Sequence, residues 1–245
     1  MALKRSFGAA LGAAADDGQG KQQSIAQPVR TLRSVRVPSG WHVAGGSLLV
    51  RDHLGERACQ GADVAAFDFD GCLAATPLGG FDPTAWKMQF ECVPNVLRSL
   101  HDQGYRIAII TNESMDRFKK ADAISKCMTK KCGRLDAFAL AVNVPMLMLC
   151  ATAKDEYRKP HVGAWRALAD HEGRTLSLSS SFFVGDAAGR KGDHSDADLK
   201  FAENVGLAFF SETAFFKHGE RLAAVHRTQP APAASENAPA ATTES

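Results

Sequence analysis

The chain has 245 residues, and its 29 basic and 27 acidic side chains leave a formal net charge of only +2 at pH 7. This length predicts one domain, with or without appended segments, and the 45% hydrophobic and 23% charged residues are typical of a soluble globular protein. The charge balance does not indicate a strongly basic nucleic-acid-binding domain. The longest uncharged run, residues 137–153, is too short for a membrane span, so we expect no membrane association.

The two ends of the chain differ from its middle in composition. Residues 1–40 are rich in Ala, Gly, Gln and Ser and carry a net charge of +4, and residues 227–245 contain no aromatic side chain. Segments with so few large apolar residues cannot offset the entropy lost on ordering. We therefore predict a disordered basic N-terminal arm over 1–40, a folded domain over 41–226 and a disordered C-terminal tail over 227–245.

Within the folded domain, short apolar runs alternate with amphipathic segments. In chain order, the pattern predicts a buried strand over 64–67, a helix over 94–103, a strand over 105–110, a long helix over 115–142, a strand over 146–151, a helix over 162–171 and a strand over 181–185. Strands that alternate with helices predict a three-layer Rossmann-like α/β fold, with a central, mostly parallel sheet and helices on both faces.

Polar side chains directly follow three of these strands. Asp68, Thr111 and Asp186 each stand where a predicted strand ends. In parallel sheets flanked by helices, ligands bind beyond the carboxyl ends of the strands. We therefore expect the functional site at this edge of the sheet.

Asp68 and Asp70 stand two residues apart, and Gly71 follows them. The glycine permits a sharp turn, and two carboxylates in one cleft raise each other's proton affinity unless a cation neutralises one of them. The arrangement suits covalent catalysis, in which one ionised aspartate attacks and its neighbour, held protonated, gives a proton to the leaving group. Taken alone, the motif is equally consistent with aspartates that only cap a turn.

Four further residues are suited to handling a phosphate. Thr111 and Asn112 offer a hydroxyl and an amide, and Lys159 directly precedes a predicted helix, where it could stabilise an anionic transition state. Asp186 is a hard oxygen ligand that would suit Mg²⁺. Each of these residues also has an ordinary explanation in a turn or on the surface, but their order and their places at strand ends are hard to attribute to chance.

Together, these motifs resemble the four motifs of the haloacid dehalogenase (HAD) superfamily, and more narrowly the 3′-phosphatase module of the polynucleotide kinase/phosphatase family. The resemblance extends over about residues 41–216 and rests on the stretches Gly46–Val50, Ala66–Leu73, Asp82–Trp86, Gly104–Ile107, Arg158–Pro160, Phe182–Arg190, Asp193–Ser195 and Phe201–Leu207. It implies a HAD-type fold and a DNA 3′-phosphatase. No kinase activity is expected, because the sequence has no GxxxxGK[ST] phosphate loop.

The resemblance also implies a role for each matching residue. Asp68 would be the nucleophile and form an aspartyl-phosphate, and Asp70 would protonate the departing 3′ oxygen and then activate the hydrolytic water. Mg²⁺ would be held by the Asp68 carboxylate, the Asp70 main-chain carbonyl and Asp186. The residues implied to bind the phosphoryl oxygens are Thr111, Asn112 and Lys159.

Three departures from the family pattern affect these expectations. Cys72 stands where the family usually has Thr, and residues 113–120 lack the usual Gln and Arg-Gly-Lys pattern after Thr-Asn. The loop after Arg190 is short, so the second acidic residue of the fourth motif is left open between Asp193 and Asp198.

Basic side chains that could contact DNA cluster in residues 113–134, which carry a local charge of +4. Such clusters commonly contact phosphates, although a solvated helix face is the ordinary alternative. Trp86 and Trp165 could stack on a base, but buried tryptophans are more common. The candidate DNA-binding residues are Arg117, Lys119, Lys120, Lys126, Lys130, Lys131 and Arg190.

The expected function is therefore hydrolysis of 3′-phosphates at DNA strand breaks. Expected partners are DNA 3′-ends, nicks and gaps, together with other repair proteins that would bind the disordered termini, and we expect a monomer. A nuclear location follows from a repair role, and the arginine-containing arm also allows a mitochondrial one. The alternative functions are a small-molecule HAD phosphatase and a non-catalytic DNA-end-binding scaffold.

Overall fold

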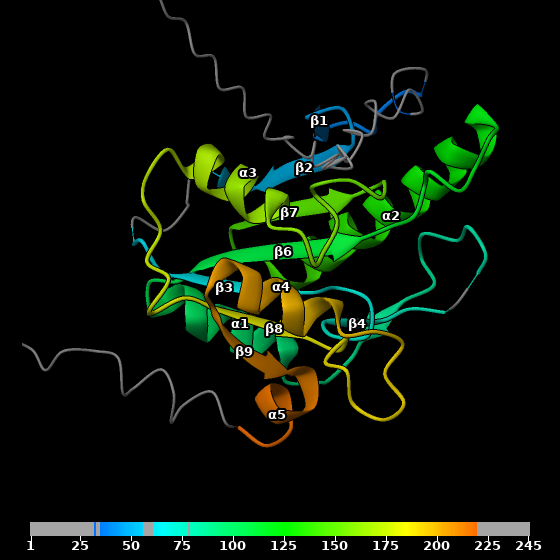
Figure 1. The fold of residues 1–245 in the computed structure, drawn as a ribbon. Helices are drawn as coiled ribbons and strands as arrows, with labels where there is room; N and C mark the ends of the chain where they lie inside the picture. Colours follow the sequence, from blue (N-terminus) through cyan, green and yellow to red (C-terminus); the bar gives the residue numbers. More distant parts are fainter. Residues whose placement is uncertain (1–31, 33–34, 56–60, 78, 220–245) are drawn as a thin grey trace, which may run out of the picture.

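A seven-stranded sheet runs through the centre of the computed structural model (Figure 1), which describes residues 32, 35–55, 61–77 and 79–219. Its order is β1-β2-β7-β6-β3-β8-β9. The strands are β1 His42–Ala44, β2 Leu48–His53, β3 Val64–Phe67, β6 Arg106–Asn112, β7 Met146–Ala151, β8 Phe182–Gly185 and β9 Ala208–Ser211. From β7 to β9 all neighbouring strands are parallel, whereas β2 pairs antiparallel with both of its neighbours, β1 and β7. The predicted mostly parallel sheet is confirmed.

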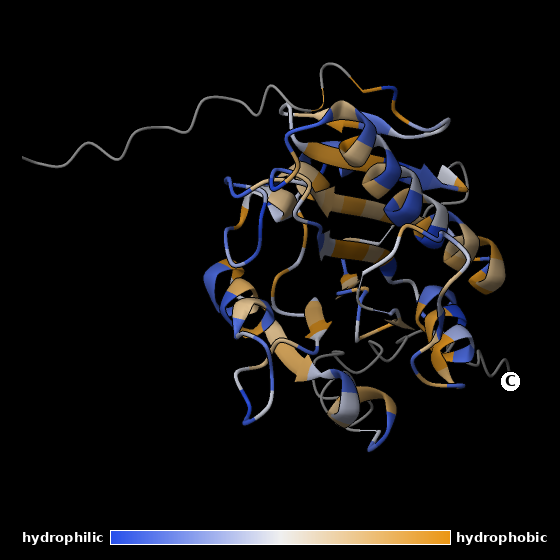
Figure 2. Ribbon diagram, turned by 90° about the vertical axis from the view of Figure 1, so that its right-hand side faces the viewer, coloured by the Kyte–Doolittle hydropathy of each residue, from blue (hydrophilic) through white to orange (hydrophobic). Residues whose placement is uncertain are grey.

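The central strands are apolar because helices cover both of their faces. All four residues of β3 and all six of β7 are buried, which is the pattern of a strand without a solvent-facing side. Figure 2 shows these strands as hydrophobic bands in the middle of the molecule, with hydrophilic residues on the surrounding helices and loops.

Five helices within the described residues form the two outer layers. One hydrophobic cluster joins alternate residues of β3 and β6, such as Phe67 and Ile107, to α1 (Val93–Asp102), α2 (Ala121–Val142) and α5 (Glu212–Phe216). A second cluster joins the opposite face of the same strands, including Ala66 and Ala108, to α3 (Gly163–Glu172) and α4 (Ala197–Val205). The predicted three layers are therefore present.

The predicted helix over 115–142 is wrong at its beginning, because α2 begins at Ala121. The main-chain N–H of Met115 donates to the carbonyl of Thr152, and the Lys154 N–H donates to the side chain of Asp116. These contacts fix the segment before α2 against the loop after β7. The helix ends where Asn143 adopts the left-handed conformation, with φ 57°.

A small two-stranded sheet, β4 (Ala74–Ala75) and β5 (Lys87–Met88), lies beside the main one. The hydrophobic core also includes residues before position 41. Leu32 is buried in this core, and Val35 and Val37 pack against the core. The rest of the predicted arm up to residue 31, and the whole predicted tail, lie outside the described residues. Among the described helices, none has the length and apolar character needed to cross a bilayer.

Candidate active site

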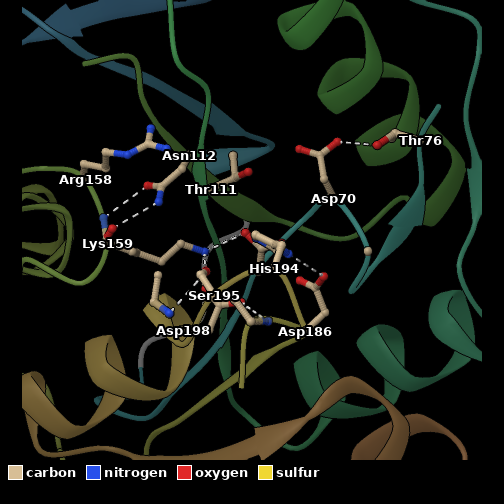
Figure 3. Close-up of a pocket in the computed structure, with 14 residues that line it drawn as sticks. Asp70, Thr76, Thr111, Asn112, Arg158, Lys159, Asp186, His194, Ser195 and Asp198 are labelled. Carbon is tan, nitrogen blue, oxygen red and sulfur yellow. Dashed lines mark hydrogen bonds and ion pairs between the residues drawn. The ribbon is translucent and has the colours of Figure 1, made fainter. Parts of the chain in front are cut away.

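The carboxyl ends of β3, β6 and β8 open onto one pocket of about 600 Å³ (Figure 3). The parallel register places these three strand ends side by side. The pocket brings together all the residues predicted for catalysis, phosphate binding and metal binding, which are Asp68, Asp70, Thr111, Asn112, Lys159 and Asp186. Asp198 also lines the pocket, whereas Asp193 is not among its lining residues.

A tight loop after β3 positions the two aspartates. The Asp68 N–H donates to the Val184 carbonyl at 2.8 Å, which ties the loop to the neighbouring strand β8. Gly71 has φ 88°, and a Cβ at this position would clash with the Asp186 carboxylate. The glycine therefore permits both the turn and the close approach of Asp186.

Asp68 is 7% exposed and lies against Lys159, whose ammonium donates to the Asp68 Oδ1 at 2.5 Å. The same ammonium lies 2.8 Å from Asp198 Oδ1. Burial raises the pKa of Asp68 to about 6, and repulsion from Asp198 and Asp70 adds to this effect, while Lys159 opposes it. Asp68 therefore lies in a site with more carboxylates than cations.

Asp70 has a different partner, Lys131 from the middle of α2. The Lys131 side chain is 1% exposed, and its ammonium donates to Asp70 Oδ2 and, at 2.9 Å, to Thr111 Oγ1. The other Asp70 oxygen accepts from the Thr76 hydroxyl at 2.6 Å. Burial would raise the pKa of Asp70, but Lys131 and the hydrogen bond from Thr76 outweigh it and hold the pKa below its usual value. The pairing with Lys131 therefore favours the ionised form of Asp70, whereas the expected donation of a proton needs its protonated form.

Three carboxylates could hold a metal ion. One ligand oxygen from each of Asp68, Asp186 and Asp198 lies within 4.8 Å of the others. Burial raises the pKa of Asp186 to about 7, and repulsion from Asp68 and Asp198 contributes. A divalent cation would relieve this repulsion, so the donor set fits a hard metal such as Mg²⁺.

Of the two candidates for the second acidic residue of the fourth motif, Asp198 lines the pocket and Asp193 does not. Asp198 is 2% exposed and accepts from the Ala187 N–H at 3.0 Å. Gly185 makes room for it, because a Cβ there would clash with the Asp198 carboxylate. Asp193 instead binds Arg190 at 2.9 Å. The short loop after Arg190 left this choice open in the sequence.

The amide of Asn112 is engaged with the main chain of Lys159. Its Nδ2 donates to the Lys159 carbonyl at 3.2 Å, and its Oδ1 accepts from the Lys159 N–H at 3.1 Å. Asn112 thus fixes the loop that carries Lys159. Thr111 accepts from Lys131, which leaves its own hydroxyl hydrogen to donate into the pocket.

Arg158 is a pocket residue that was not expected to contribute to the site. It lines the pocket, and its Nη1 is buried with no hydrogen-bond partner among the described residues. A guanidinium in this state is suited to a phosphate ligand. Its place beside Lys159 in the sequence was the available signal.

The basic residues expected to contact DNA fall into three groups. Lys119 and Lys120 are exposed, as are Arg117 and Lys126, whose side chains are each 59% exposed. Lys130 and Lys131 are buried, so their expected place on an exposed basic face is wrong. The reason is that they point inward from α2, toward Glu113 and Asp70 respectively. Arg190 is engaged with Asp193 and Glu212.

Comparison with known proteins identifies similar sequences. The sequence profile of a family described as "Polynucleotide kinase 3 phosphatase" matches residues 63–216. The chain is 44% identical over 166 residues to polynucleotide 3′-phosphatase ZDP of Arabidopsis thaliana, a match that covers 62% of this chain and 24% of that protein. It is 34% identical over 154 residues to the bifunctional polynucleotide phosphatase/kinase of Schizosaccharomyces pombe, covering 62% of this chain and 36% of the relative. The chain therefore matches a quarter to somewhat over a third of the length of these curated relatives.

A solved structure supports the fold. A putative HAD-like phosphatase from Mesorhizobium loti superposes with a TM-score of 0.52 at 18% identity, covering 68% of this chain and 79% of the other. At this identity the similarity concerns the fold alone. It agrees with the predicted HAD-type arrangement of a central sheet between two helical layers.

Proposed function

Because the chain belongs to the polynucleotide kinase 3 phosphatase family, we propose that it removes phosphate from the 3′ ends of DNA strands. The observation that supports this most is the pairing of Asp68 and Asp70 with separate lysines in the pocket that also holds Asp186 and Asp198. A non-catalytic scaffold has no need of this whole set.

Mg²⁺ would be held by the carboxylates of Asp68 and Asp186 and by the main-chain carbonyl of Asp70. The raised pKa values of Asp68 and Asp186, about 6 and about 7, support this proposal, because burial and the neighbouring carboxylates disfavour the ionised forms there and a bound cation would favour them. When bound, the cation would offset the repulsion between the carboxylates and a phosphate dianion.

In the first step, an Asp68 oxygen attacks phosphorus, the bond from phosphorus to the 3′ oxygen breaks, and an aspartyl-phosphate forms. The departing oxygen requires a proton, which Asp70 is placed to give. Since Lys131 holds Asp70 ionised, Asp70 must first take up a proton. A phosphate monoester, whose second pKa is about 6, can bring that proton as its monoanion.

In the second step, water attacks the aspartyl-phosphate, and Asp70 accepts a proton from that water. The ionised state that Lys131 favours is the one this step needs. Lys159, Arg158 and the hydroxyl of Thr111 would bind the phosphoryl oxygens, while Asn112 keeps Lys159 in place. Inorganic phosphate then leaves, and Asp68 is regenerated.

We propose a phosphatase without kinase activity, because the chain contains no GxxxxGK[ST] loop. The proposed substrates are DNA ends, nicks and gaps, bound by a monomer. Exposed Lys119 and Lys120 are suited to contact the strand. The proposed location is the nucleus, with the mitochondrion as the alternative, and a fluorescent fusion of the full chain would distinguish them. Repair proteins would bind the terminal segments, which a pull-down with and without residues 1–31 would test.

The direct test is phosphate release from a 3′-phosphorylated oligonucleotide with Mg²⁺ present. The proposal expects release from the oligonucleotide with a higher kcat/KM than from glycerol 2-phosphate. The absence of release from the oligonucleotide would contradict the proposal. A higher kcat/KM for the small ester would instead favour a small-molecule HAD phosphatase.

A further inference from the structure

A second hollow, of about 450 Å³, adjoins the catalytic pocket and shares Thr76 with it. It is formed by the ends of the small β4–β5 sheet and the residues next to them. Its lining residues are Ala75, Thr76, Pro77, Ala85, Trp86 and Lys87. Apart from Thr76, whose hydroxyl donates to Asp70, none of them has a role in the mechanism above.

The chemistry of this hollow is apolar. The polar side-chain groups of its lining are the Thr76 hydroxyl, the Lys87 ammonium and the indole N–H of Trp86. The Thr76 hydroxyl already donates to Asp70. Trp86 is half-buried, and its ring is held by an edge contact with Phe138 at 6.1 Å between centroids. Lys87 is exposed, so its ammonium can meet a strand phosphate at the rim.

The position of Thr76 connects this hollow with the leaving group. Asp70 is the residue placed to protonate the departing 3′ oxygen, and Thr76 lies 2.6 Å from it (Figure 3). The sugar that carries this oxygen must therefore lie near Thr76. The group attached to that sugar, the terminal base, then lies next to the hollow.

We propose that the hollow receives the base of the nucleotide that carries the 3′-phosphate, with Trp86 as the aromatic contact. This inference rests on the proposed function. A largely apolar site that offers an aromatic ring would accept any of the four bases, because every base has an aromatic face to stack. The hollow would position the end of the strand without reading its sequence.

The test uses two oligonucleotides with 3′-phosphates that differ only at the terminal nucleotide, which is intact in one and carries a tetrahydrofuran in place of the base-bearing sugar in the other. For the unaltered protein we expect kcat/KM to be about tenfold lower for the abasic substrate, within the range of base–aromatic stacking effects. Trp86→Leu should lower kcat/KM for the intact substrate about tenfold and leave the abasic substrate almost unchanged.

Two further variants distinguish loss of the base site from a general loss of folding. Ala85→Leu fills the hollow while Trp86 stays in place, so it should reproduce the selective loss even if Trp86→Leu folds poorly. Trp165→Leu is the matched control, because Trp165 is 7% exposed in the other core cluster. It should leave the ratio between the two substrates as it is in the unaltered protein.

The outcomes separate this inference from the proposed function. Equal kcat/KM for both substrates in the unaltered protein would overturn the base site and leave the phosphatase assignment standing. Equal losses on both substrates in Trp86→Leu and Ala85→Leu would also overturn it, since that is the result of a structural role. If phosphate is released from neither oligonucleotide, the proposed function and the base site are both overturned.

Discussion

Asp68 and Asp70 lie two residues apart and each meets a buried lysine, yet their proton affinities move in opposite directions. Lys159 lies against Asp68 and 5.1 Å from the ring centroid of Phe183, and Lys131 lies against Asp70 and 5.1 Å from that of Phe69. The pKa of Asp68 is raised to about 6, whereas that of Asp70 is lowered.

The difference comes from the other charges near each lysine. Lys159 is shared between Asp68 and Asp198, and Asp186 lies within the same cluster. Asp70 has Lys131 as its own partner and Thr76 as a further hydrogen-bond donor. One side of the pocket therefore has more carboxylates than cations and suits a metal ion, while on the other side the charge of Asp70 is compensated by Lys131 and the site suits proton transfer.

The largest expected effects come from replacing either aspartate, and substrates with different leaving groups distinguish the two roles. Asp68→Asn should lower kcat by at least about 1000-fold for every substrate, because the nucleophile is lost. Asp70→Asn should lower kcat/KM about 100-fold or more for the oligonucleotide. It should lower kcat/KM much less for p-nitrophenyl phosphate, because kcat/KM reports the first step and this leaving group departs without a proton. Steady-state kinetics with both esters measures this, and equal losses of kcat/KM in Asp70→Asn would contradict the proton-transfer role of Asp70 in the first step.

Removal of the Lys131 charge should make Asp70 resemble Asp68. In Lys131→Met, burial is no longer opposed by the ammonium, so the pKa of Asp70 rises. The water-activation step then requires a higher pH, and kcat near neutral pH should fall by up to about 100-fold. The pH profile of kcat measures the shift.

The matched control for this change is Lys130→Met, because Lys130 is also buried but lies 3.5 Å from Glu113. In Lys130→Met, the acidic limb of the pH profile of kcat should lie at the same pH as in the unaltered protein. A profile displaced equally in both variants would show a general structural effect and contradict the specific pairing of Lys131 with Asp70.

A smaller effect is expected from the exposed basic residues before α2. Lys119→Glu/Lys120→Glu should raise KM for the oligonucleotide about tenfold or more at low salt, because contacts between lysines and phosphates release counterions. KM for p-nitrophenyl phosphate should not change, and neither should KM for DNA in Lys217→Glu, which alters another exposed lysine. An equal change for both substrates would show that this segment is not on the DNA path.

The smallest expected effect concerns metal binding and stability. The pKa values of Asp68 and Asp186 are above that of an unfolded aspartate, so without metal their contribution to stability is lost as the pH rises from about 4 to about 7. Mg²⁺ should restore this contribution to stability and therefore raise Tm more at pH 7.5 than at pH 5. Each 1 kcal/mol of added stability corresponds to a rise in Tm of about 2–4 °C. Thermal melts of the unaltered protein and Asp186→Asn measure this, and an equal rise at both pH values would contradict it.

Much of the sheet could be predicted from the sequence because its central strands are buried on both faces. Continuous apolar runs such as 64–67 and 146–151 gave the bounds of β3 and β7 correctly. The beginning of α2 could not be predicted, because the main-chain bond between Met115 and Thr152 joins segments far apart in sequence. Strands β1 and β2 and the helix α4 were not assigned from the sequence.

For the site, too, local sequence signals predicted some residues, while others depended on tertiary packing. Asp68, Thr111 and Asp186 were found because each stands at a strand end, where the sheet brings neighbours together. Lys131 was assigned to an exposed face because it lies in a charged run. A signal was present, since Lys131 lies four residues from Cys127 and from Leu135, both buried, and so occupies a core-facing helical position. Asp198 required the structure, because only its packing distinguishes it from Asp193.

The most direct test of the contrast between the two aspartates is to trap the covalent intermediate. Asp70→Asn is mixed with p-nitrophenyl phosphate and Mg²⁺, quenched in acid and digested, and the peptides are analysed by mass spectrometry. Since the first step needs little acid catalysis with this ester and the second still needs Asp70, one phosphoryl group should accumulate on Asp68. A phosphoryl group on another residue, or product formation with no labelled peptide under these conditions, would contradict the account.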